Sequence, residues 1–400
     1  MISRFGLALG ACVAVSVAGA TWLLPHGRET LQTPFAEPRR EARWDVDDSR
    51  AAAVRELALR QARVWTPPPD PSAADLTANP RDPDGNLSGD LVRCLYLDRP
   101  PRGTTPKFDC VLSNGEIIRV KYGATTEIQG EVAASRFITA RGFGADRMYL
   151  VRHLRCFGCL RTPYQAARLL DRLNLREAAQ SLLPDNRYSD FEWAAVERHF
   201  EGREIVSPDR PGWGWEELAP IDGSYGANRA ERDALRLVSL MIAHSDAKPS
   251  NQRLVCVGDR DASDTCPRPF ALIHDLGDTF GLNNSGLAQW KKFGIWKDRE
   301  RCAVTMREFP DDRITFRDRY ISEEGRRLLA RELRMLTDAQ IEALFVSTRV
   351  TRVSGNGNAE LWTQTMRDKI HEIVDGPPCP ATADFETSPA VPISERLKGR

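Results

Sequence analysis

Two short runs decide the expected fold: His244–Asn251, with the sequence HSDAKPSN, and Asp275–Gly277, with the sequence DLG. The first run places a carboxylate, an ammonium group and an amide at fixed offsets on one loop, and the second adds a carboxylate before a glycine. Phosphoryl transfer requires a carboxylate beside the attacking hydroxyl, a cation at the transferring phosphate, and oxygen ligands for magnesium. The two runs together supply all of these groups.

The pattern H-x-D-x-K-x-x-N followed by D-x-G resembles the catalytic and metal-binding loops of the protein-kinase-like superfamily, whose template reads H-R-D-L-x-x-x-N and then D-F-G. The resemblance covers roughly residues 91–281. It implies an α+β, two-lobed protein-kinase-like fold with a small antiparallel-sheet N-lobe and a mainly helical C-lobe, braced by disulfides. The missing glycine-rich and A-P-E signatures mark an atypical member, broadly similar to secretory-pathway kinases.

The resemblance also assigns roles to the residues of the two runs. Asp246 would be the catalytic base that accepts the proton of the substrate hydroxyl, and Lys248 would neutralise the transferring phosphate. Asn251 and Asp275 would bind one or two Mg²⁺ or Mn²⁺ ions, which favour oxygen ligands. His244 would be a structural brace of the loop.

The segment before these runs supplies the expected nucleotide contacts. Strands are predicted at three places, followed by a helix: 91–97, 107–112, 116–122 and Glu127–Ala140. Lys121, in the third strand, matches the superfamily lysine that holds the α and β phosphates of ATP and pairs with a helix glutamate. Glu131 is the first choice for that glutamate and Glu127 the second.

The hairpin loop between the first two strands would cover the nucleotide phosphates. It lacks G-x-G-x-x-G, so phosphate contact would depend on Gly103, Thr104 and Thr105, with Lys107 as a further candidate. The alternative is a plain solvent-exposed hairpin.

Composition and the N-terminus bear on partners and location. Lysine plus arginine equal aspartate plus glutamate at 56 each, so the chain has no overall basic field and a nucleic-acid partner is not expected. In Met1–Leu24, Arg4 precedes an apolar run with the small-residue site Ala18–Ala20. This pattern predicts a signal peptide or a retained signal anchor, with a buried helix of a cytosolic protein as the alternative. We therefore expect an exported protein, either periplasmic, extracellular or anchored facing outside the cytosol, that meets the membrane only through this segment.

Nine cysteines are present, and those outside the N-terminal segment are even in number, which in an exported chain favours a disulfide framework. Cys256 and Cys266 are the best local pair, because they lie on two predicted strands joined by a polar loop. Cys94 and Cys110 lie on two further predicted strands.

Cys156 and Cys159 form a C-x-x-C motif with several interpretations. The pair could be a structural disulfide, a redox pair or half of a zinc site. No second C-x-x-C or H-x-x-x-H completes a zinc site, so structural use is favoured.

The expected domain order runs from the signal segment through a spacer to the two lobes: 25–88 as a proline-rich spacer with one helix at about 47–65, 89–155 as N-lobe, 156–375 as C-lobe and 376–400 as a loose tail. A strand is expected at 148–154 before the linker between the lobes. Further helices are predicted from periodicity and cap residues at 163–174, 190–200, 229–243, 322–336, 337–350 and 359–374.

These observations leave alternative functions open. The main hypothesis is a phosphotransferase that moves the terminal phosphate of metal-bound ATP, or another nucleoside triphosphate, to a hydroxyl of a protein or glycan. A pseudokinase that binds nucleotide or ligand without turnover is the second, and a thiol–disulfide protein using Cys156 and Cys159 is the third. A plain alternative is an exported α+β domain in which Asp246 and Asn251 merely cap backbone groups.

Overall fold

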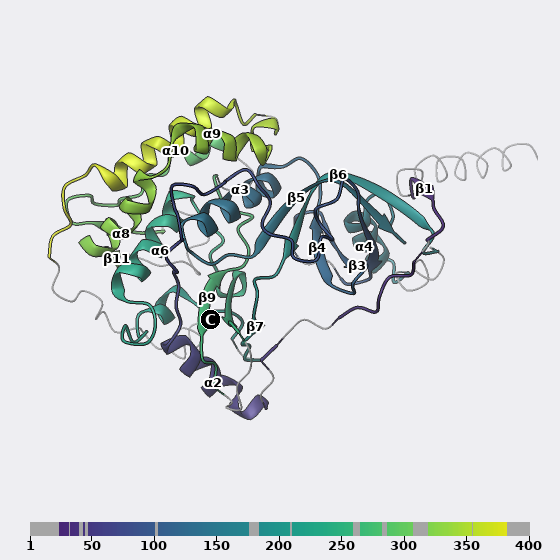
Figure 1. Ribbon diagram of the computed structural model, residues 1–400, viewed down its shortest axis with the longest axis horizontal. Coiled ribbons are helices and arrows are strands. Elements are labelled where there is room, and N and C mark those ends of the chain that lie inside the picture. The colour runs from purple at the N-terminus through teal and green to yellow at the C-terminus, as the bar shows by residue number, and fades with distance from the viewer. Residues whose placement is uncertain are drawn as a thin grey trace, which may run out of the picture. The chain divides into compact units, whose positions relative to one another are not determined.

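The computed structural model describes residues 24–31, 33–39, 43–44, 47–100, 103–175, 184–208, 210–258, 265–281, 286–306, 319–353 and 355–381. The chain divides into two compact units, drawn in Figure 1. The first unit comprises Met1–Glu41, Arg81–Gly123 and Tyr149–Arg198, and the second comprises Ala42–Pro80, Ala124–Met148 and His199–Arg400. The predicted signal segment lies outside the described residues, except for Leu24.

The first unit is built on a six-stranded sheet with the order β1-β6-β4-β3-β2-β5, in which β5 also pairs with β6. Its strands are β1 (Gly27–Arg28), β2 (Val92–Leu97), β3 (Lys107–Leu112), β4 (Ile117–Lys121), β5 (Arg147–Phe157) and β6 (Arg187–Arg198). The pairs along β2, β3, β4 and β6 are antiparallel, whereas β2 and β5 are parallel, with Val92 opposite Leu154. The β5–β6 pairing closes the sheet into a barrel of five strands, to which β1 adds through β6.

The predicted two-lobed kinase-like fold is therefore wrong. The strand expected to lead to a linker between lobes is β5, which instead lies inside the closed sheet. The segment predicted as a helix at 190–200 is largely β6, paired with β4 so that Glu197 lies opposite Arg119. A closed sheet satisfies the backbone N–H and C=O groups on both edges of each strand, and this gain overrides a weak local helical preference. The three strands predicted upstream are confirmed as β2, β3 and β4.

Two disulfides lie side by side in the core of the first unit. Cys94 bonds to Cys110 and Cys156 bonds to Cys159, and none of the four side chains is exposed. Cys110 Sγ lies only 3.9 Å from Cys156 Sγ, so the bridges form one sulfur cluster. The predicted Cys94–Cys110 pair is confirmed, and the C-x-x-C motif is a buried disulfide.

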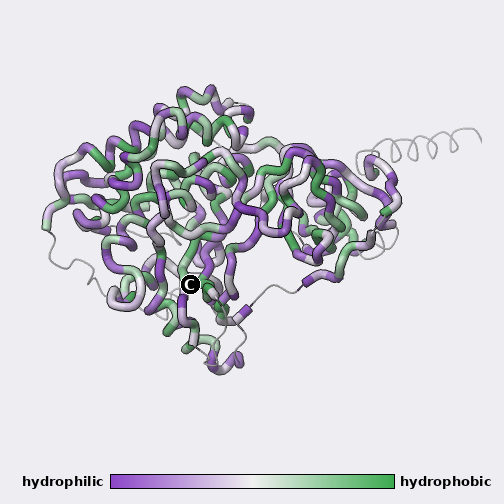
Figure 2. The backbone as a smooth tube through the Cα atoms, viewed as in Figure 1, coloured by the Kyte–Doolittle hydropathy of each residue, from purple (hydrophilic) through white to green (hydrophobic). Residues whose placement is uncertain are grey.

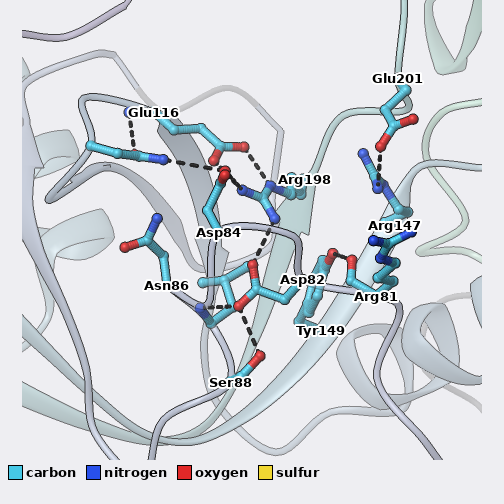
Figure 3. A network of polar contacts seen from close by, with 12 residues as sticks. Arg81, Asp82, Asp84, Asn86, Ser88, Glu116, Arg147, Tyr149, Arg198 and Glu201 are labelled. Atoms are coloured by element: carbon cyan, nitrogen blue, oxygen red, sulfur yellow. Dashed lines mark hydrogen bonds and ion pairs between the residues drawn. The ribbon is translucent and has the colours of Figure 1, made fainter.

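An arginine at the end of β6 fixes the chain that enters the sheet, as Figure 3 shows. The Arg198 guanidinium donates to Asp82 at 2.9 Å, to Asp84 at 3.1 Å and to Glu116. Asp82 also accepts the backbone N–H of Leu87 at 2.6 Å. Because the Arg198 side chain is only 6% exposed, these charge-assisted bonds hold the segment before β2 against the sheet.

Helix α4 (Pro163–Arg172) completes the first unit, and the second unit is mainly helical (Figure 1). Its helices are α2 (Asp48–Arg60), α3 (Thr126–Ala140), α6 (Arg229–Met241), α7 (Leu287–Trp290), α8 (Glu323–Arg334), α9 (Asp338–Ser347) and α10 (Ala359–Val374). Its short strands are β7 (Arg203–Glu204), β8 (Gln252–Cys256), β9 (Pro269–Ile273), β10 (Ala303–Val304) and β11 (Arg319–Tyr320). Single 3-10 turns occur at η1 (Trp215–Leu218), η2 (Pro249–Asn251) and η4 (Val350–Arg352).

Side-chain caps explain where several of these helices begin. Thr125, Asn228 and Thr337 accept backbone N–H groups at the starts of α3, α6 and α9, and Asn228 and Thr337 form capping boxes. Polar and apolar stretches alternate along the outer helices, as Figure 2 shows. Helix α6 instead is buried from Glu231 to its end and forms the centre of the unit.

The remaining disulfides brace the second unit. Cys256 bonds to Cys266 across the β8–β9 hairpin, which confirms the predicted pair. Cys302 bonds to Cys379, which lies in the segment where the sequence suggests a loose tail. Among the helices that the structure describes, none combines the length and apolar character needed to cross a bilayer.

Candidate functional site

The loop that carries Asp246 leaves α6 by a sharp turn. Ala243 has a φ of 52°, a left-handed conformation that is uncommon for a residue with a Cβ. The backbone N–H of His244 then donates to Ser239 at 2.9 Å, and that of Ser245 donates to the Asp278 carbonyl at 3.0 Å. These bonds tie the loop both to the helix before it and to the segment that follows the DLG run.

Three of the predicted groups meet on this loop. The Asn251 amide donates to Asp246 Oδ2 at 2.9 Å and to the Asp246 carbonyl at 2.7 Å. Lys248 Nζ lies 2.7 Å from the same carboxylate oxygen. The side chains of Asp246 and Lys248 are 35% and 37% exposed, so the pair is open to solvent, whereas Asn251 is buried.

The fourth predicted group, Asp275, is joined to the loop through Asn251. The Asn251 carbonyl accepts the backbone N–H of His274 at 2.9 Å and that of Asp275 at 3.2 Å, at the end of the β8–β9 hairpin. Asp275 Oδ1 in turn accepts the Gly277 N–H at 3.0 Å. Asn251 therefore connects the Asp246 carboxylate with the Asp275 backbone inside one unit.

Helix α3 brings a glutamate to the DLG run. A Cβ added at Gly277 would lie 3.1 Å from Asp275 Oδ1 and 3.3 Å from Glu127 Oε1, so these two side chains flank the glycine closely. Glu127 was the second choice for the helix glutamate. Glu131, the first choice, is buried one turn further along α3.

The imidazole of His244 is buried close to the Asp246 and Asp275 carboxylates. Its side chain is fully buried, and neither ring nitrogen has a hydrogen-bond partner among the residues that the structure describes. Burial lowers the pKa of His244 to about 4, against the opposing effect of the negative charges on Asp275 and Asp246. The imidazole is therefore neutral at physiological pH.

One contact that holds the loop could not be read from motif spacing. The Trp215 indole N–H donates to the Ala247 carbonyl at 3.2 Å, from a side chain that is 2% exposed. The Trp215 side chain thus packs in the core beside the loop and fixes the loop backbone.

The predicted nucleotide lysine lies in the first unit. Lys121 Nζ is 3.4 Å from Glu197 Oε2, and the two side chains are only 3% and 2% exposed. Glu197 could not be identified from the sequence as the partner of Lys121, because its segment was predicted as a helix. On β6 it lies diagonally across from Lys121. The lysine is thus held by a buried carboxylate of the neighbouring strand.

The hairpin loop before β3 is fixed by aromatic and basic side chains that motif spacing did not reveal. Gly103 adopts a φ of 77°, and its carbonyl accepts the Tyr164 hydroxyl of α4 at 2.7 Å. Arg168 donates to the same hydroxyl at 2.7 Å. Thr105 is buried and Thr104 is exposed. The predicted site residues therefore fall into two groups, one in each unit.

Comparison with known proteins gives little to add. The sequence matches no family model, and no curated protein is detectably similar. Among solved structures, the crystal structure of the Helicobacter pylori proinflammatory kinase CtkA matches with a TM-score of 0.36 and 9% sequence identity, over 67% of this chain and 89% of that chain. A similarity this low establishes neither the fold nor the activity of the present chain.

Proposed function

We propose that this chain is a metal-dependent phosphotransferase, which moves the terminal phosphate of ATP or another nucleoside triphosphate to a hydroxyl of a protein or glycan. The observation that carries the proposal is the connection of Asp246, Lys248 and Asp275 through Asn251. In this proposal Asp246 serves as an accessible base and Lys248 as an exposed cation, with Asn251 and Asp275 as oxygen ligands beside the disulfide-closed β8–β9 hairpin.

In this proposal the base is Asp246. Its carboxylate takes the proton of the acceptor hydroxyl as the hydroxyl oxygen attacks the terminal phosphorus, and the bond from that phosphorus to the bridging oxygen breaks to release the nucleoside diphosphate. The partial exposure of Asp246 allows an acceptor to approach it. General-base catalysis of this kind contributes roughly 10²- to 10⁴-fold to the rate.

Lys248 would exchange partners during the reaction. In the structure it neutralises Asp246, and in the reaction its ammonium group would move to the phosphate. An ion pair exposed to this degree typically stabilises by less than about 1 kcal/mol, so the exchange costs little.

The fit to a divalent cation comes from the donor set. The Asn251 side-chain amide is held by its nitrogen, which leaves the oxygen as the metal-binding atom, and Asp275 adds a carboxylate. Such oxygen ligands suit Mg²⁺ or Mn²⁺, which when bound would neutralise charge on the phosphates. Four disulfides favour export to an oxidising compartment.

The test combines nucleotide binding with turnover. We expect ATP with Mn²⁺ to raise the melting temperature of the wild-type chain, and Asp275→Asn to abolish that rise. Asp246→Asn should keep the rise but lose at least about 100-fold in phosphate transfer from γ-labelled ATP. Asp368→Asn, which changes an exposed carboxylate on α10, is the matched control.

Two outcomes would overturn the proposal. A thermal shift without any transfer by the wild type would identify a nucleotide-binding module without turnover. If neither nucleotide nor metal changes the melting temperature, both interpretations are wrong.

A further inference from the structure

A second group of ligand-type side chains, none of them on the Asp246 loop, lies within the second unit. Asp146 directly precedes β5, His199 directly follows β6, and His274 directly follows β9. The side chains of His199 and His274 both contact the Asp146 carboxylate, at its Oδ2 atom. Three strand ends thus bring a carboxylate and two imidazoles to one point.

The carboxylate is oriented by the backbone. Asp146 is almost completely buried, and its Oδ1 accepts the N–H of Phe200 at 2.8 Å. Its other oxygen, Oδ2, lies 2.5 Å from His274 Nδ1 and 3.3 Å from His199 Nδ1. Ligand atoms on one tetrahedral zinc ion, with bonds of about 2.1 Å, stand about 3.4 Å apart. The spacing to His199 already fits, and His274 would move away by less than about 1 Å.

An arginine occupies the point where these atoms meet. Arg253 Nη1 contacts His199 Nδ1 and lies 3.5 Å from Asp146 Oδ2. A guanidinium group only donates hydrogen bonds, so the contact with Arg253 uses a lone pair of His199 Nδ1, whereas the contact with Asp146 Oδ2 uses a proton on the same atom. The lone-pair state is the one that binds a metal. Arg253 has another acidic neighbour, since its Nε is 3.6 Å from Glu204 Oε1.

We propose that Asp146, His199 and His274 bind a divalent transition-metal ion such as Zn²⁺, and that the Arg253 guanidinium fills the site in its absence. Two imidazole nitrogens and one carboxylate oxygen suit zinc and its neighbours, whereas Mg²⁺ and Ca²⁺ prefer oxygen alone. His199 is 33% exposed, which gives the ion a path from solvent.

The site is distinct from the proposed phosphotransfer site, although the two are close in sequence. None of its three ligands has a role in phosphate transfer, and its preferred metals differ. His274 immediately precedes Asp275, so a bound ion would fix the backbone at the start of the DLG run. The competing interpretation is an ion-pair cluster in which Arg253 is a permanent member.

Metal binding by the full chain without a histidine tag separates the two interpretations. After dialysis against EDTA, we expect the wild type to bind one Zn²⁺ per chain in a calorimetric titration, and Co²⁺ to give visible absorption bands. His199→Ala should weaken Zn²⁺ binding at least about 10-fold and remove the Co²⁺ bands. His371→Ala, which removes an exposed imidazole on α10, is the matched control and should bind like the wild type.

Arg253→Met provides the sharper arm, because Asp146 variants can fail to fold. If the guanidinium competes with the ion, this variant binds Zn²⁺ more tightly than the wild type and recovers melting temperature when Zn²⁺ is added. The proposal is overturned if the wild type binds no Zn²⁺ or Co²⁺, or if His199→Ala binds them as tightly as the wild type. Unchanged or weaker Zn²⁺ binding by Arg253→Met would refute the competition between arginine and metal.

Discussion

Replacing His244 by leucine should remove a specific part of the acid sensitivity of this protein. The imidazole is fully buried without a hydrogen-bond partner among the described residues, and leucine is close to it in volume. Its pKa is lowered by burial from an ordinary 6.5 to about 4. Below pH 6.5 the unfolded chain therefore binds a proton that the folded chain excludes, and the free energy of unfolding falls as the pH falls towards 4.

The size of the effect follows from the two pKa values. Between pH 7.5 and pH 5.0 the proton uptake of the unfolded state at this one position lowers the free energy of unfolding by about 2 kcal/mol. Leucine cannot take up the proton in either state. The His244→Leu variant should therefore lose about 2 kcal/mol less than the wild type over the same interval, whatever its stability at pH 7.5.

Urea unfolding without reductant, followed by tryptophan fluorescence at both pH values, measures this difference. Trp215 contacts the loop that follows His244 and therefore reports on the second unit. His371→Leu, at an exposed position of α10, is the matched control for loss of an imidazole. If His244→Leu and the wild type lose the same stability between pH 7.5 and pH 5.0, the assignment of a neutral, buried imidazole is refuted.

Two further predictions concern the frame of each unit. Lys121→Met should destabilise the closed sheet by about 3–5 kcal/mol in urea unfolding, because it leaves the buried Glu197 without this cation. The double variant, Lys121→Met with Glu197→Met, should recover much of the loss. Equal losses in the single and double variants would contradict this. Replacing Cys302 and Cys379 by serine removes a disulfide between residues 77 positions apart in the sequence. The free energy of unfolding should fall by up to about 4 kcal/mol, seen as a lower melting temperature in calorimetry. An unchanged melting temperature would show that the bridge adds nothing.

Elements with strong local signals were predictable from the sequence. Helix α6 has a capping box at Asn228 and an apolar body, and α10 was predicted with the bounds that the structure shows. The β8–β9 hairpin followed from two apolar runs around a polar loop with a cysteine on each side. In each case the features that made the element predictable lie close together in the sequence.

The closed sheet could not be predicted in the same way. The β2–β5 pair joins Val92 to Leu154 in parallel, and such a distant pairing leaves no local pattern. In β6 buried and exposed positions alternate from Ser189 to Glu192, but after Trp193, which has a φ of 54°, every residue of the strand is buried. The kinase-like template then led to an open N-lobe, since it matched the order of the elements but carried no information on their pairing.

The same distinction applies to the sites. Asp246, Lys248 and Asn251 lie within one turn-rich run, so their proximity was predictable from spacing. Asp146 and His199 come from separate segments and meet only because the strands beside them end together. The sequence carried no signal of this meeting, because 190–200 was predicted as a helix and the strand after Asp146 was expected only at 148–154.

The sulfur cluster has a consequence for how the chain reaches its native state. With Cys110 Sγ only 3.9 Å from Cys156 Sγ, a bond between these two atoms is the nearest wrong pairing during oxidation. Synthesis from the N-terminus limits this error, because Cys94 and Cys110 are made first and lie on adjacent strands of one hairpin. Refolding of the reduced full-length chain offers all four thiols at once, so scrambled isomers should accumulate there unless thiol–disulfide exchange resolves them.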